Sequence, residues 1–222
     1  MNVSEAVASR RSVRAFLDRP VDGVLLRRLL EQAARAPSGG NLQPWHLHAV
    51  GGEEMLRLKA IMRERLAGGA QETPEYFVYP QQLGEPYRRY RYELGEALYA
   101  ELGIAREDRA GRLKQFARNF QFFDAPLAVF CSVDRQMGPP QWSDLGMYLQ
   151  TLMLLLREAG LDSCPQECWS AYPKTIAEFL QLPAERMLFC AVAIGYADEQ
   201  APVNRLRSAR APLADFAEFR GI

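Results

Sequence analysis

The sequence has no excess charge of either sign and very little lysine. Its 222 residues include 27 Lys+Arg and 27 Asp+Glu, so the formal net charge is zero at pH 7. A neutral chain has no long-range field that attracts nucleic acid or an anionic membrane, so we expect neither as a partner. The only lysines are Lys59, Lys114 and Lys174, so arginine carries nearly all of the positive charge. A local cluster of arginines is therefore a candidate site, because guanidinium groups bind phosphate and carboxylate through paired hydrogen bonds.

Cysteine and histidine are also scarce, which argues against a metal site. The four cysteines are Cys131, Cys164, Cys168 and Cys190. They form no Cys-x-x-Cys pair, and the two histidines, His46 and His48, have no third ligand nearby. Because a zinc site needs at least three protein ligands, we predict no metal. The two histidines are expected to be partly buried structural residues.

No segment has the composition of a membrane anchor or an export signal. The longest apolar stretch, around residues 149–156, is too short to span a bilayer. Residues 1–16 lack the apolar core of a signal peptide. We therefore expect a protein of the reducing cytoplasm, without a membrane partner.

Three motifs that often identify an enzyme class are missing. The sequence contains no G-x-G-x-x-G, no G-x-x-x-x-G-K-[ST] and no G-x-S-x-G. These absences argue against a Rossmann dinucleotide-binding turn, a P-loop and the nucleophile turn of a serine hydrolase.

The hydrophobic pattern predicts one α+β domain over residues 1–222. Helices are predicted over residues 2–10, 21–36, 54–67, 93–102, 107–123, 143–159 and 173–182, and strands over residues 45–50, 127–133 and 187–194. With three or four strands and more helix than strand, the sheet is expected to be small and flanked by helices. Residues 70–90, rich in proline and tyrosine, are predicted to be irregular, as in a lid or binding loop.

The first candidate motif is Arg10-Arg11-Ser12-Val13-Arg14, at the end of a predicted helix. In an extended segment Arg10, Ser12 and Arg14 point to one side. Two guanidinium groups and a hydroxyl on one side suit a phosphate or another planar anion. Taken alone, the motif is better explained as a solvated basic patch.

The second motif is Pro37-Ser38-Gly39-Gly40-Asn41-Leu42-Gln43-Pro44-Trp45. Its two glycines allow the backbone to approach a ligand closely. The amides of Asn41 and Gln43 match the edge of a heterocycle, whereas a plain turn requires neither of them.

Two further motifs carry less information by themselves. Ser163-Cys164-Pro165-Gln166-Glu167-Cys168-Trp169 follows the most apolar helix, and a connection with a buried tryptophan would look the same. Asn204-x-x-Arg207-x-x-Arg210-x-Pro212 lies in the polar tail, where a charged surface segment is the simpler interpretation.

Together, and in this order, the four motifs resemble the FMN-dependent nitroreductase family. R-R-S-x-R near residue 10 and P-S-G-G-N-x-Q-P-W are the most specific, and the helix with Asp144, Gly146 and Gln150 also fits. The resemblance implies a small, central, mainly antiparallel sheet in a domain-exchanged homodimer with two FMN sites at its interface. It also implies that residues 70–115 form a variable substrate lid and that residues 201–222 extend onto the partner subunit.

The resemblance assigns FMN contacts to the four motifs and to Asn119. These residues are Arg10, Arg11, Ser12, Arg14, Pro37, Ser38, Gly39, Asn41, Gln43, Asn119, Pro165, Gln166, Glu167, Cys168, Arg207 and Arg210. It implies that Arg10, Ser12 and Arg210 hold the phosphate and ribityl chain, with help from Arg207. It places Arg14 near the pyrimidine end of the flavin, where a cation stabilises the reduced anion. The Glu167 N–H would face flavin N5, and no side chain acts as a catalytic group.

Two residues depart from the family pattern. Cys168 stands where many relatives have glycine. Its side chain would either narrow the approach to flavin N5 or merely fill the space beside the ring. Gln121 falls near a position where some relatives have a lysine beside the flavin, so this site has one cation fewer.

The implied activity is hydride transfer from NAD(P)H, followed by reduction of a nitroaromatic, a quinone or a similar electron-poor substrate in ping-pong order. Another reductase on the same scaffold (enoate, flavin or dehalogenating) and a non-catalytic FMN-binding carrier or regulator remain alternatives. The sequence leaves the preference for NADH or NADPH open, since Arg88, Arg89 and Arg91 would meet either a 2′-phosphate or water. It also leaves open whether the lid tyrosines stack on substrate or pack the lid.

Overall fold

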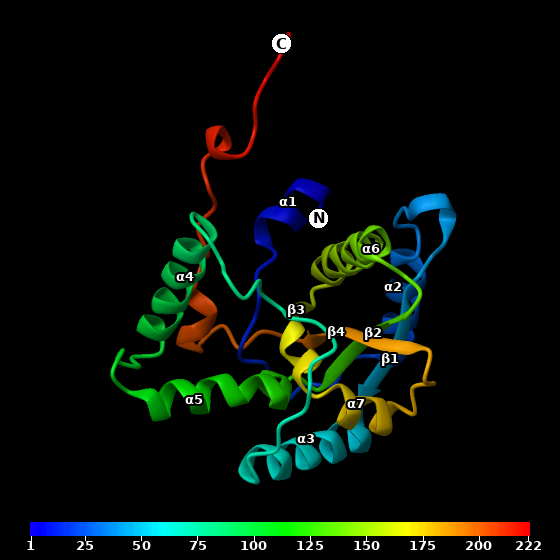
Figure 1. Ribbon diagram of the computed structural model, residues 1–222, viewed down its shortest axis with the longest axis vertical. Helices are drawn as coiled ribbons and strands as arrows, with labels where there is room; N and C mark the ends of the chain where they lie inside the picture. Colours follow the sequence, from blue (N-terminus) through cyan, green and yellow to red (C-terminus); the bar gives the residue numbers. More distant parts are fainter.

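The computed structural model describes residues 1–222 and contains one four-stranded sheet between layers of helices (Figure 1). The strands are β1 (His46–Gly51), β2 (Leu127–Asp134), β3 (Asp162–Gln166) and β4 (Arg186–Gly195). Their order is β1-β2-β4-β3, and each neighbouring pair is antiparallel. The expected small antiparallel sheet of an α+β fold is therefore confirmed.

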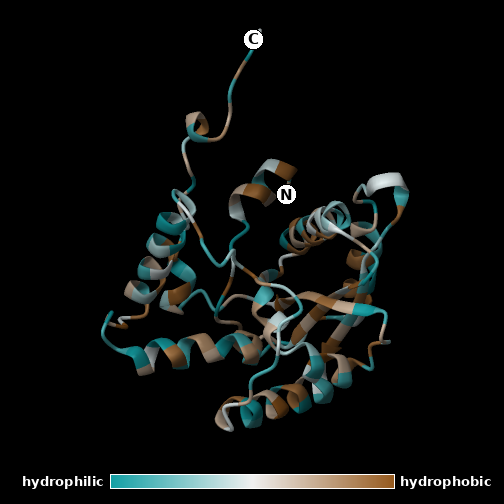
Figure 2. Cartoon of the chain, viewed as in Figure 1, coloured by the Kyte–Doolittle hydropathy of each residue, from teal (hydrophilic) through white to brown (hydrophobic).

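Seven α-helices surround this sheet. They are α1 (Val3–Ser9), α2 (Gly23–Ala33), α3 (Gly52–Ala67), α4 (Tyr87–Glu101), α5 (Arg109–Ala117), α6 (Pro139–Glu158) and α7 (Pro173–Leu180). One buried cluster joins α2 and α6 to one face of the sheet, and a second joins α3 and α7 to the other face. In β2, Val129 and Cys131 belong to the first cluster and Ala128 and Phe130 to the second. Burial on both faces explains why the central strands are hydrophobic over most of their length, as the largely brown strands in Figure 2 show.

The sequence prediction missed β3, because its residues Asp162–Gln166 are polar and include Pro165. The strand pairs on only one side with another strand, β4. A proline is tolerated at such an edge, since its missing N–H removes no bond of the sheet interior. On the other side of β3, the Val13 N–H donates to the Ser163 carbonyl at 3.0 Å, and Ser12 forms a parallel bridge with Ser163.

The predicted helix over residues 107–123 is wrong in its second half. The α-helix ends at Ala117, and Arg118–Asp124 forms a 3-10 segment. Phe122 (φ 53°) and Phe123 (φ 55°) adopt the left-handed region there. Both rings are almost completely buried, and the Phe122 ring stacks on Trp169 at 4.5 Å between centroids. Tertiary burial of the rings overrides the local helical pattern, because it repays the backbone strain.

Helix α4 and the C-terminal tail lie at the edge of the body. Helix α4 begins at Tyr87, six residues before the predicted start at Glu93, and buries none of its residues. Its nearest packing partner is the short helix Pro202–Arg205, and the chain beyond it projects away from the sheet (Figure 1). None of the helices combines the length and the apolar character needed to cross a bilayer.

Leu152→Ala tests the packing between α6 and the sheet. Leu152 is 0% exposed and belongs to the cluster of α2, α6 and the sheet. We expect the free energy of unfolding to fall by about 2–5 kcal/mol, because a cavity replaces the isobutyl group. Leu56→Ala is the matched control, since Leu56 is 66% exposed. In urea denaturation, Leu56→Ala is expected to lower the free energy of unfolding by only about 0.5 kcal/mol. An equal decrease for the two variants would contradict the packing described.

Candidate functional site

The first motif leaves α1 as an extended segment along the edge of the sheet. Asn2 and Glu5 form a capping box at the start of α1, and Arg10 follows its last residue with φ −62° and ψ 128°. From there the bridge between Ser12 and Ser163 fixes the segment beside β3. Arg10, Ser12 and Arg14 are thereby carried to the surface next to the carboxyl-terminal tail.

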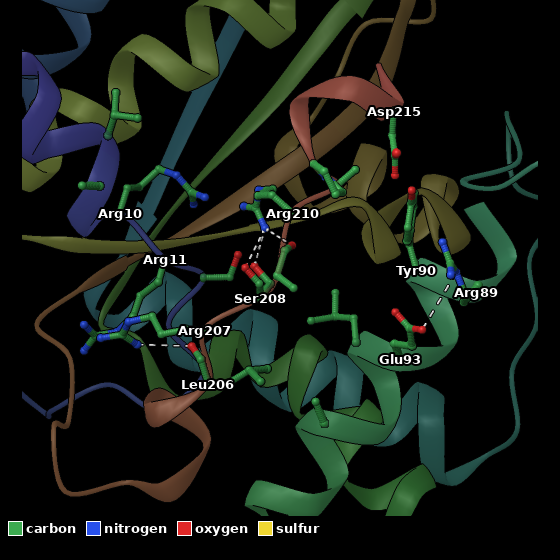
Figure 3. A pocket seen from close by; sticks show the side chains of 18 of the residues that line it. Arg10, Arg11, Arg89, Tyr90, Glu93, Leu206, Arg207, Ser208, Arg210 and Asp215 are labelled. Carbon is green, nitrogen blue, oxygen red and sulfur yellow. Dashed lines mark hydrogen bonds and ion pairs between the residues drawn. The ribbon is translucent and has the colours of Figure 1, made fainter. Parts of the chain in front are cut away.

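The fourth motif meets this segment from the other end of the chain. After β4, Asn204 is anchored in the short helix Pro202–Arg205, and its side-chain oxygen accepts from the Arg14 N–H at 2.8 Å. Residues 206–212 then run past the arginines of the first motif. Figure 3 shows Arg10 and Arg210 approaching from these two segments, with their side chains directed toward one another.

The two segments enclose a cavity of about 1200 Å³. Its lining includes Arg10, Arg11, Ser12, Arg14, Arg207, Ser208 and Arg210, with Arg89, Tyr90 and Glu93 of α4 on the opposite wall (Figure 3). Asp215 and Gln150 complete its polar lining. Six arginines face two acidic residues, so the cavity is a strongly cationic site within a neutral protein.

The charges around this cavity are only partly compensated. Burial and the neighbouring Arg210 guanidinium lower the pKa of Arg10. Arg11 is paired with Glu199 (Nη2 to Oε2, 2.6 Å), but its buried Nε has no partner. Arg210 donates to the hydroxyl of Ser208 at 2.7 Å and to neighbouring carbonyls. Guanidinium groups and hydroxyls converging without a matching carboxylate suit a bound phosphate.

No residue of the third motif lines this cavity. The Gln166 amide donates to the Asn119 carbonyl at 2.8 Å and contacts its side-chain oxygen at 3.3 Å. These two predicted residues are therefore brought together, next to Pro165, Glu167 and Cys168. Burial raises the pKa of the Glu167 carboxyl and of the Cys168 thiol.

Gln121 is held by its own surroundings. Its amide donates to the Lys59 and Phe120 carbonyls, and its oxygen accepts from Arg63 at 3.0 Å. Its side chain thus joins the 3-10 segment to α3, and all of its polar groups are already hydrogen-bonded within the protein.

The second motif is not part of the cavity within one chain. The Gly39 N–H points at the buried Asp144 carboxyl of α6 (3.3 Å), and the Ser38 hydroxyl accepts from the Gln43 N–H at 3.0 Å. Asn41 (φ 57°) and Gln43 (φ 50°) adopt the left-handed region. Figure 1 places this loop, which includes Pro37, beyond α6 and across the molecule from α4.

Several lining residues were not predicted from the sequence. Ser208 lies between the two tail arginines, and its S-x-R spacing resembles Ser12-x-Arg14, so this signal was present. Glu93 lines the cavity as well, but its helical spacing carries no sign of it. Gln150 and Tyr90 also line it, and the sequence had marked them only as part of a helix that fits the family and as a lid aromatic. No group of three histidine, cysteine or acidic side chains is arranged to hold a metal ion.

A family model described as the nitroreductase family matches residues 7–196. The chain belongs to the nitroreductase family. It is 37% identical to 4-nitrobenzoate reductase of Pseudomonas putida over 97% of this chain and 94% of the relative. It is 33% identical to chloronitrobenzene nitroreductase of Comamonas testosteroni over 98% of this chain and 96% of that relative.

Solved nitroreductases have the same fold. The FMN and NADPH-dependent nitroreductase NfnB from Sphigopyxis sp. strain HMH is 50% identical, with a TM-score of 0.97 over 100% of both chains. NfnB from Mycobacterium smegmatis, solved in complex with NADPH, is 31% identical, with a TM-score of 0.92 over 99% of this chain and 100% of that one. The nitroreductase fold therefore covers the whole chain.

If the cavity binds phosphate, inorganic phosphate will stabilise the FMN-free protein more than chloride at equal ionic strength. A ligand that binds only the folded state raises the unfolding free energy by RT ln(1 + [L]/Kd). Arg210→Gln is expected to remove most of the gain in melting temperature. Arg220→Gln is the control, since Arg220 lies outside the cavity and pairs with Glu218. A gain that survives Arg210→Gln would contradict this assignment.

Proposed function

We propose that this nitroreductase is an NAD(P)H-dependent FMN oxidoreductase that reduces nitroaromatic, quinone or similar electron-poor substrates in ping-pong order. The observation that supports it most strongly is the convergence of Arg10, Ser12 and Arg14 with Arg207 and Arg210 on one cavity. The names of its relatives, 4-nitrobenzoate reductase and chloronitrobenzene nitroreductase, support nitroaromatic substrates. Those of the two NfnB structures support FMN and NADPH.

The donor set of the cavity fits the phosphate end of FMN. Arg10, Ser12 and Arg210 would hold the phosphate and ribityl chain, with Arg207 beside them and Arg11 neutralised by Glu199. The unpartnered Nε of Arg11 and the buried Ser163 hydroxyl, also without a partner, add unused polar groups along this segment. Ser208, whose hydroxyl already accepts from Arg210, would keep that arginine oriented toward the phosphate.

The flavin, when bound, supplies the hydride chemistry, and the protein supplies orientation and electrostatics. Arg14 would place a fixed positive charge near the pyrimidine end, favouring the reduced anionic form. The Glu167 N–H would face N5, where hydride arrives. Asn119 and Gln166, joined by their hydrogen bond, would border the ring with Pro165 and Cys168.

A second copy of the chain would complete the site. Within one chain, Pro37, Ser38, Gly39, Asn41 and Gln43 lie far from the arginines, so only a partner would bring such a loop to the flavin. The tail also ends with apolar side chains that cover nothing. Leu213, Phe216, Phe219 and Ile222 recur at every third residue and are at least 55% exposed. We propose a homodimer in which residues 201–222 extend onto the partner.

The other proposed assignments follow from this arrangement. We propose one domain over residues 1–222, with residues 70–115 as a variable lid. Arg89, Tyr90 and Glu93 support a lid role, since they belong to that segment and form a wall of the cavity. We also propose a cytoplasmic location, where the four free cysteines would stay reduced.

An anaerobic titration of the purified protein with NADPH and with NADH, followed at the flavin absorbance band, tests the function. We expect the bound flavin to bleach with NADPH and to recover on addition of 4-nitrobenzoate or a quinone. Parallel initial-velocity lines are expected, because reductant and oxidant would use the same flavin face in turn. Flavin that neither nucleotide bleaches would indicate a carrier instead, and a protein that takes up no FMN would contradict the proposal.

Co-expression of two variants with different tags tests the shared site. Arg10→Ala and Asn41→Ala homodimers are each expected to lose most activity. In a heterodimer, one site would contain both defects and the other neither. We therefore expect purified heterodimers to regain about half of the wild-type activity per dimer, as fixed by the symmetry of a two-site dimer. Heterodimers as inactive as both parents would show that each chain builds its own site.

A further inference from the structure

We propose that Asn204 is a positioning residue that fixes the spacing between the two arginine-bearing segments before FMN binds. This inference rests on the proposed function, because it concerns how the same phosphate site is assembled. Asn204 itself lines none of the cavity and is only 3% exposed. It therefore acts on the arginines from behind and touches no ligand.

Asn204 makes three side-chain hydrogen bonds, two of them to residues at the other end of the sequence. Its Oδ1 accepts from the Arg14 N–H at 2.8 Å, and its Nδ2 donates to the Ala15 carbonyl at 2.8 Å. The same Nδ2 donates to the Asp198 carbonyl at 2.9 Å. Through its own carbonyl, Asn204 also accepts from Arg207 Nη1 at 3.1 Å. One residue thus joins Arg14, Arg207 and the chain that leaves β4.

The geometry requires an amide. One acceptor must face an N–H while two donors on the same side chain face two carbonyl oxygens. A primary amide provides this combination. An aspartate would retain the acceptor but turn a carboxylate oxygen toward two carbonyls. A leucine of similar size would leave the buried side of the Arg14 N–H without a partner, while the Ala15 and Asp198 carbonyls would keep only their backbone bonds from the Asp198 and Ala201 N–H groups.

The electrostatics explain why such an attachment is needed. The guanidinium groups of Arg10 and Arg210 are close enough for Arg210 to lower the pKa of Arg10, so the two segments repel one another without a bound anion. Asn204 joins the two segments through uncharged side-chain hydrogen bonds, which add to the backbone bond from the Asp198 N–H to the Ala15 carbonyl. The cations are then already in place when phosphate arrives, which reduces the cost of ordering them on binding.

Binding of FMN and of riboflavin to the FMN-free protein tests this role, with Kd measured by flavin fluorescence. Riboflavin lacks the phosphate, so the Kd of riboflavin divided by the Kd of FMN (the phosphate preference) isolates the contribution of the phosphate site. We expect Asn204→Leu to reduce this ratio by about tenfold. Asn204→Ser, which keeps one hydrogen-bonding group, is expected to give an intermediate ratio and remains informative if the leucine variant does not fold.

Thr175→Val is the matched control for general loss of stability. Thr175 lies in the first turn of α7 and is also 3% exposed. Its hydroxyl donates a hydrogen bond to the Glu72 carboxylate, and neither residue lines the cavity. We expect it to lower the melting temperature but to leave the Kd of riboflavin divided by the Kd of FMN unchanged. If the wild type prefers FMN and the Asn204 variants keep that preference, Asn204 has only a structural role. A wild-type protein that binds no FMN would contradict the proposed function itself, and with it the role of Asn204.

Discussion

The parallel bridge between Ser12 and Ser163 is the contact on which the anion site depends. Through it, the Val13 N–H bonds the Ser163 carbonyl at 3.0 Å and the segment after α1 lies along β3. The Arg10–Arg14 segment thereby adjoins the strand that leads to Pro165–Cys168. If the segment shifted along β3 by one residue, its alternate side chains would exchange sides and the arginines would turn away from the cavity.

The energetic problem of this site is the assembly of like charges. Six arginines line one cavity, and few acids balance them. The protein meets the problem with neutral backbone and amide bonds, from Ser163 on one side and Asn204 on the other. The uncompensated charge is then available to a phosphate. The protein as a whole is neutral although this cavity is strongly cationic, because most of the acidic residues that balance its arginines lie outside the cavity.

The sequence predicted the central strands and the main helices because their apolar pattern is continuous. Strand β3 escaped prediction, since its sequence is polar and its stability comes from pairing at an edge. The break after Ala117 also escaped, because buried phenylalanine rings determine it. For the site, the order of four motifs sufficed to indicate the family. The hydrogen bonds of Asn204 are long-range contacts that no local pattern reveals. The sequence raised Arg89 as a candidate contact but could not place α4 as a wall of this cavity.

A crystal structure of the protein with FMN would locate the phosphate and thereby test whether the two arginine-bearing segments form its binding site. We expect the phosphate between Arg10, Ser12 and Arg210 of one chain, with Asn41 and Gln43 of a second chain at the flavin. We also expect the Asn204 bonds to Arg14 and Ala15 to be unchanged from those of the FMN-free protein. A phosphate bound away from these arginines, or a flavin enclosed by one chain alone, would contradict this arrangement.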